Sequence, residues 1–174
     1  HQQLNVLDCE ARSGVDLGAY LVVGIDENDF LNRLPRSDDP NEGFVGSLGD
    51  PRGQIPPNSY GVHAGPIAAL LREYGLNAVE QHGLGFESLK SEIAAGRPVM
   101  VWVIGNTTSG FGTSYTPSNG HTTVVAPYEH TVLVIGYNAD VVTLLDESNI
   151  YNRATATFLN SWAVLGNMAV TVGN

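Results

Sequence analysis

The hydrophobic pattern of this chain changes character near its middle, and that change limits the folds open to it. Before residue 97, apolar residues recur at helical spacing over 13–23, 27–34, 65–74 and 86–95. After it, β-branched and apolar runs typical of strands occupy 98–104, 122–126, 130–137, 141–145 and 168–172. A short helix is expected over 156–165. Helices followed by strands predict an α+β fold, with the helices segregated against a mostly antiparallel sheet.

Size and charge narrow the possibilities further. A chain of 174 residues with 43% hydrophobic content fits one domain spanning residues 1–174, and neither repeats nor a linker interrupt it. No apolar run approaches the roughly 18 residues that a membrane span needs. The formal net charge of −10 would repel phosphates. We therefore expect neither a nucleic-acid partner nor binding to an anionic membrane.

An irregular stretch separates the second and third expected helices. Residues 35–62 are dense in Pro, Gly, Asp and Asn and show no periodicity. A loop this long is typically functional, but it could equally be a surface excursion held by Phe44, Val45 and Tyr60. Its SDDPNEG segment carries oxygens that could bind calcium. Their spacing does not follow the EF-hand pattern, which favours a solvated turn.

Cys9 is the only cysteine, and it lies where the first helix is expected to start. Unpaired backbone N–H groups and the helix dipole at that position favour a thiolate, the reactive form of the side chain. The competing interpretation is a buried structural cysteine. A lone cysteine forms no internal disulfide, so stability is expected to come from packing alone.

Two residues much later in the chain could assist such a nucleophile. His130 opens one strand run and Asp146 closes the next, with a natural hairpin turn at 136–140 between them. An imidazole can take the thiol proton, and a carboxylate can hold the imidazole in the correct tautomer. His63 is the alternative base and Glu147 the alternative acid.

A side-chain amide near the thiol could complete this site. Gln3 lies six residues before Cys9 and could donate to the oxyanion of a tetrahedral intermediate, with Gln2 as an adjacent alternative. The histidines lack metal-ligand spacing such as HExxH, and one cysteine cannot build a structural zinc site. The sequence therefore predicts catalysis without a metal or cofactor.

The order Gln, Cys, His, Asp resembles that of papain-like cysteine peptidases. More closely, several long segments resemble the C39-like peptidases, a mostly bacterial family, and together they extend over nearly the whole chain. These segments are CEARS, LPRSDDPNEGFVG, GQIPPNSYGVHAGP, EIAAGRPVMVWVIGN, EHTVLVIGYN and SWAVLGNMAV. The CGSCW signature of plant and lysosomal papain relatives is missing around Cys9.

The resemblance implies a papain-like fold in which N-terminal helices carry the thiol on a central helix against the sheet. It also implies Cys9 as nucleophile, His130 as base, Asp146 as orienter and Gln3 as oxyanion donor. The expected activity is hydrolysis of a peptide or protein substrate through a thioester. An amidase, deamidase or transglutaminase-like enzyme with the same triad, and a non-catalytic binding module, remain alternatives.

The start of the chain bears on where the protein works. It begins at His1 without a basic-then-apolar leader, so we expect a processed or trimmed product from which any export signal has already been removed. This favours an extracellular or cell-envelope location and leaves a cytoplasmic one open.

Overall fold

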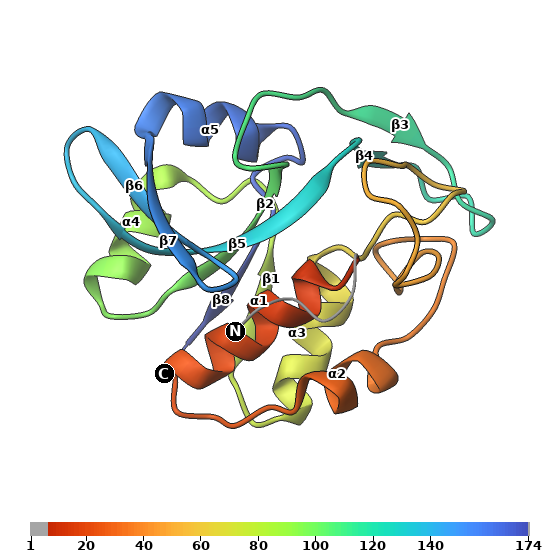
Figure 1. Ribbon diagram of the computed structural model, residues 1–174, viewed down its shortest axis with the longest axis horizontal. Helices are drawn as coiled ribbons and strands as arrows, with labels where there is room; N and C mark the ends of the chain where they lie inside the picture. Colours follow the sequence, from red (N-terminus) through yellow and green to blue (C-terminus); the bar gives the residue numbers. More distant parts are fainter. Residues whose placement is uncertain (1–6, 174) are drawn as a thin grey trace.

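A computed structural model describes residues 7–173 and places one antiparallel sheet between two groups of helices (Figure 1). The sheet has the strand order β1-β8-β2-β5-β6-β7, and every neighbouring pair is antiparallel. The strands are β1 (Ala78–Gln81), β2 (Val99–Ile104), β5 (Glu129–Tyr137), β6 (Val141–Asp146), β7 (Asn149–Ala154) and β8 (Ala169–Val172). The predicted α+β class with a mostly antiparallel sheet is thus confirmed.

Helices cover both faces of the sheet. One face carries α1 (Cys9–Tyr20), α2 (Glu27–Arg33) and α3 (Ala64–Glu73), and the other carries α4 (Phe86–Ala94) and α5 (Thr155–Ala163). Strand β2 requires cover on both faces, because all six of its residues are buried. Met100, Trp102 and Ile104 join the core under α1–α3. Val99, Val101 and Val103 join the core under α4 and α5. A strand buried on both sides reads as a continuous apolar run.

The expected helices are present, with one shift at the first. Helix α1 begins at Cys9, four residues before the apolar pattern starts at residue 13, and ends at Tyr20 instead of residue 23. Buried polar groups in its first turns, among them Arg12 and Ser13, hid this start from a search for apolar spacing. Helix α2 has the expected cap, because the side chain of Asp26 accepts a hydrogen bond from the N–H of Asp29.

Three strands escaped the sequence analysis. β1 and β7 form the two edges of the main sheet, and β3 (Thr113–Tyr115) pairs with β4 (Thr123–Val125) in a separate two-stranded sheet. β7 reads NIYNRA, and none of its residues is buried. Such a strand lacks the apolar alternation from which strands are recognised.

The long loop at 35–62 is held by a small core of its own. Val45, Tyr60 and Val125 form a buried cluster, and Val45 pairs with Gly61 in an isolated β-bridge. Phe44 is buried in the main core. The three residues that the sequence suggested as anchors are therefore all buried.

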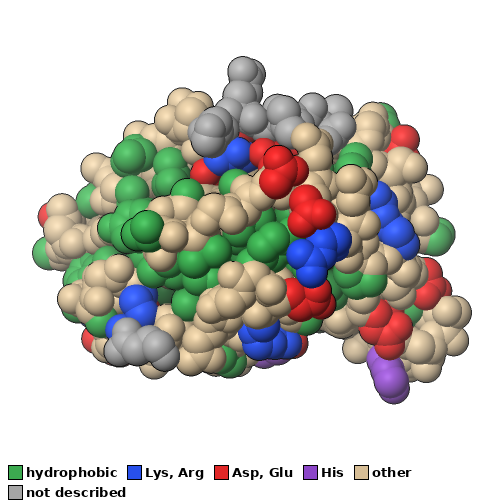
Figure 2. Space-filling model, turned by 90° about the horizontal axis from the view of Figure 1, so that it is seen from below, with side chains coloured by type: hydrophobic (Ala, Val, Ile, Leu, Met, Phe, Trp, Pro, Cys, Tyr) green, Lys and Arg blue, Asp and Glu red, His purple; other side chains and the backbone are tan. Residues whose placement is uncertain are grey.

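The surface mixes apolar and charged side chains. On the face shown in Figure 2, hydrophobic side chains reach the surface over a broad area, and acidic and basic side chains lie next to one another. Such pairs occur where Arg33 of α2 meets Asp29 and Glu73. Among the described residues, no helix has the length and apolar character needed to cross a membrane.

Candidate active site

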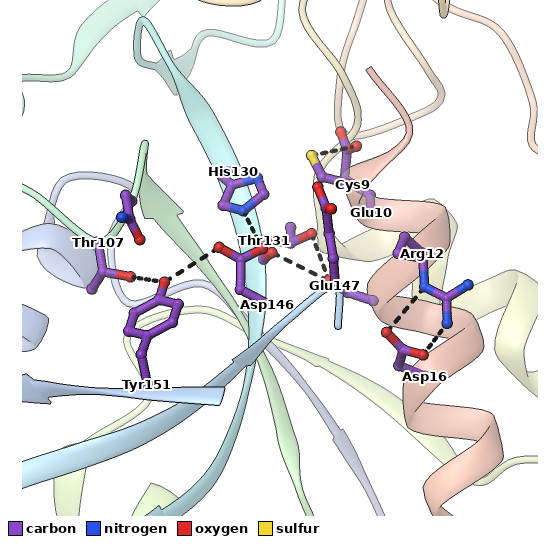
Figure 3. A network of polar contacts seen from close by, with 12 residues as sticks. Cys9, Glu10, Arg12, Asp16, Thr107, His130, Thr131, Asp146, Glu147 and Tyr151 are labelled. Atoms are coloured by element: carbon purple, nitrogen blue, oxygen red, sulfur yellow. Dashed lines mark hydrogen bonds and ion pairs between the residues drawn. The ribbon is translucent and has the colours of Figure 1, made fainter. Parts of the chain in front are cut away.

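The first turn of α1 is fastened to β5 beside the candidate histidine. Ser13, one turn after Cys9, contacts the carbonyl oxygen of Thr131 at 3.2 Å and its hydroxyl at 3.0 Å. Thr131 directly follows His130 on β5. Cys9, His130 and Asp146 consequently line one cavity of about 220 Å³. Figure 3 shows His130 between Asp146 and the start of α1.

His130 and Asp146 are joined by a hydrogen bond of 2.8 Å between Nε2 and Oδ1. Because a carboxylate accepts, Nε2–H donates, and Nδ1 of the ring is left as an acceptor. The second oxygen of Asp146 accepts from the Tyr151 hydroxyl at 3.3 Å. Burial works to raise the pKa of Asp146, but the interactions with His130, together with smaller contributions from Tyr151 and Arg52, outweigh it, so that this pKa is lowered.

The sulfur of Cys9 is in a less expected environment. The side chain is buried, with 7% exposure, and Sγ–H donates to Oε2 of Glu10 at 3.0 Å. Burial, followed by the charges of Glu10 and Glu129, raises the pKa of Cys9 well above its ordinary value. These surroundings favour the thiol over the expected thiolate. The expectation rested on the start of the helix and did not include the two neighbouring carboxyl groups.

Glu10 and Glu129 form a buried carboxyl pair that sequence reasoning missed. Oε1 of Glu10 accepts from the N–H of Val62 at 2.6 Å, whereas neither oxygen of Glu129 has a hydrogen-bond partner among the described residues. Burial, then the charge of Glu10, raises the pKa of Glu129 well above its usual range. The available signal was position, because one acid directly follows the cysteine and the other directly precedes the histidine.

Comparison with known proteins connects this geometry to a family. The profile of the Peptidase_C39 like family matches residues 9–170, from the candidate nucleophile to the last strand. The chain belongs to this family.

Two relatives resemble this C39-like domain. The crystal structure of a Bacillus anthracis protein, provisionally assigned as a C39-like peptidase, superposes with a TM-score of 0.86 at 26% identity. The match covers 99% of this chain and 92% of the other. The uncharacterized protein YvpB of Bacillus subtilis is 32% identical over 139 residues, which are 77% of this chain. The domain spans about half of YvpB, 52% of its length.

The remaining candidates lie in different places in the C39-like domain. His63 has no exposed surface and is bonded to Tyr60 and Asn41, away from the cavity that His130 lines. Glu147 lines that cavity, 4.0 Å from Arg52 of the 35–62 loop. Gln3 and its alternative Gln2 lie outside the described residues.

Proposed function

We propose that this C39-like domain is a cysteine peptidase in which Cys9 is the nucleophile, His130 the base and Asp146 the orienting acid. The observation that carries the proposal is the hydrogen bond between His130 and Asp146 at the wall of the cavity that Cys9 lines. This bond fixes the tautomer in which Nδ1 can accept a proton. A peptide entering the cavity would meet the thiol and this nitrogen together.

The reaction begins with a change of partner for the thiol. Sγ–H leaves the Glu10 carboxylate and gives its proton to Nδ1 of His130, so that the thiolate can attack the peptide carbonyl carbon. The oxyanion is stabilised by the backbone N–H of Cys9 and, as the family resemblance implies, by the amide of Gln3. His130 then protonates the departing amine, and water hydrolyses the thioester.

One observation favours a second candidate, a non-catalytic binding module. The sulfur of Cys9 is buried and bonded to Glu10, and its pKa is raised, as for a packed structural cysteine. In that case the cavity would bind a peptide without cleaving it. The two candidates differ in whether the thiol can reach His130.

Turnover of a peptide library, followed by mass spectrometry, separates the candidates. The peptidase predicts no cleavage by Cys9→Ala and a loss of about 10²–10⁴-fold in His130→Ala, the usual contribution of a positioned base. His121→Ala, which alters an exposed loop histidine, should keep the wild-type rate. Conversion of glutamine side chains without backbone cleavage would instead identify a deamidase.

A labelling experiment covers the case in which the library lacks a substrate. Iodoacetamide should alkylate Cys9 in the wild type faster than in His130→Ala, because the histidine accepts the thiol proton. Equal and slow alkylation in both proteins, together with absent turnover, would reject the peptidase and favour the binding module.

A further inference from the structure

Three potential metal ligands converge at the junction of α1 and β5. The Cys9 sulfur, one carboxylate oxygen of Glu10 and one of Glu129 all lie within 4.8 Å of one another. Cys9 and Glu10 are the first two residues of α1, and Glu129 is the first residue of β5. The bond between Ser13 and Thr131 holds the two elements in this arrangement.

The Glu129 side chain is the observation that points to a ligand. Both of its carboxylate oxygens are buried, and neither has a hydrogen-bond partner among the described residues. Leaving a buried carboxyl group without a partner is costly, and more so when it is charged. The group lies within reach of two further donor atoms, so one cation could satisfy all three side chains at once.

The backbone at Gly61 leaves room for this convergence. A Cβ at that position would lie 2.2 Å from Oε1 of Glu10 and 2.8 Å from Oε2 of Glu129. Gly61 also has a φ of +142°, which side-chain-bearing residues rarely adopt. Both carboxyl groups thus pack against bare backbone, and any other residue would push them apart.

We propose that Cys9, Glu10 and Glu129 bind a zinc-class divalent cation. Thiolate favours Zn²⁺ over Mg²⁺ or Ca²⁺, which require six or more oxygen ligands. Three protein ligands with a fourth position open are the usual arrangement of an accessible zinc site. Two of the three ligands, Cys9 and Glu129, also line the cavity of the candidate active site.

Zinc at this position would regulate the proposed reaction by blocking it. The ion would bind the sulfur that must attack the substrate, so the loaded protein would be inactive until the metal is removed. This consequence rests on the proposed peptidase function, but binding itself does not.

Binding can be measured without a substrate. Zinc is titrated into the metal-free protein in competition with a chromophoric chelator, and cobalt is used as a spectroscopic substitute. We expect one zinc per chain, a thiolate-to-cobalt absorption band, and protection of Cys9 from iodoacetamide. Glu129→Gln should weaken zinc binding at least about tenfold, because it removes one of three ligands. Cys9→Ser should abolish the absorption band.

Glu147→Gln is the matched control, because Glu147 is an acid on the same cavity wall but outside the cluster. It should keep the wild-type zinc affinity, and calcium should not compete. Equal zinc binding by wild type, Glu129→Gln and Cys9→Ser would show an adventitious ion only and overturn the site. Absence of peptide cleavage by the metal-free protein, with zinc binding intact, would instead count against the peptidase alone.

Discussion

Replacing His63 should remove a large part of the acid sensitivity of this domain. The imidazole has no exposed surface, Nε2 contacts the Tyr60 hydroxyl at 3.1 Å, and Nδ1 contacts Oδ1 of Asn41 at 2.9 Å. The amide nitrogen of Asn41 is bonded to Asp39, so its oxygen faces the ring and Nδ1 carries the proton. Nε2 therefore accepts from Tyr60, and the neutral imidazole already has both of its hydrogen bonds.

The size of the effect follows from the pKa. Burial lowers the pKa of His63 from 6.5 to about 3, against a partial opposing effect of Asp39 and with a small contribution of the same sign from His82. Below pH 6.5 the unfolded chain binds the proton and the folded chain does not, so stability falls as the pH falls. This difference in pKa corresponds to ~5 kcal/mol of unfolding free energy, of which ~2.5 kcal/mol is lost between pH 7 and pH 4.5.

Urea unfolding at these two pH values, followed by the fluorescence of the buried Trp102 and Trp162, measures this contribution. The wild type should lose ~2.5 kcal/mol more than His63→Gln between pH 7 and pH 4.5, because other titrating groups cancel in the difference. Tyr60→Phe is the control, since it removes one hydrogen bond, worth ~1 kcal/mol at both pH values, but keeps the buried imidazole. If wild type and His63→Gln lose the same free energy, the argument from burial is refuted.

Three further substitutions test the site itself. Asp146→Asn should lower kcat/KM for peptide cleavage by about 10–100-fold, because a hydrogen bond to a charged group contributes ~1.5–3 kcal/mol. Tyr151→Phe should lower kcat/KM by only about fivefold, the equivalent of one neutral hydrogen bond of ~1 kcal/mol. A loss as large as that of Asp146→Asn would contradict the smaller role given to Tyr151. Gly61→Ala should destabilise the fold by ~1–3 kcal/mol in urea unfolding, because its φ is strained for alanine and its Cβ meets Glu10; an unchanged midpoint would argue against this close approach.

The sequence predicted the parts of the fold that depend on apolar periodicity. Strand β2 and helix α3 were found almost to the residue, because each has a strong hydrophobic pattern of the appropriate period. The edge strand β7 was missed because it buries nothing. Helix α4 was found, but its position on the opposite face from α1 was not, because periodicity shows that a helix has a buried side without showing which sheet face it covers.

The candidate site also has parts that could be predicted from the sequence and parts that could not. His130 and Asp146 could be paired in advance, because a hairpin between two recognised strands brings their ends together. The raised pKa of Cys9 could not be predicted. It depends on burial and on two carboxyl groups, and one of these, Glu129, comes from a strand far from Cys9 in the sequence. Gln3 stays a prediction, since it lies outside the described residues.

Strand parity explains why the acid next to the histidine escaped attention. Successive side chains of a strand point to opposite faces, and directly paired residues share a face. Glu129 pairs with Ile104 on the face covered by α1, whereas His130 pairs with Val103 on the opposite face. The sulfur at the start of α1 therefore lies beside Glu129. Cys9 and His130 share only the cavity at the end of the strand, which both residues line. A register shift of one residue would exchange the two, placing the base beside the thiol and the acid away from it. The pairing of β5 with β2 therefore decides whether this cysteine rests beside an acid or beside a base.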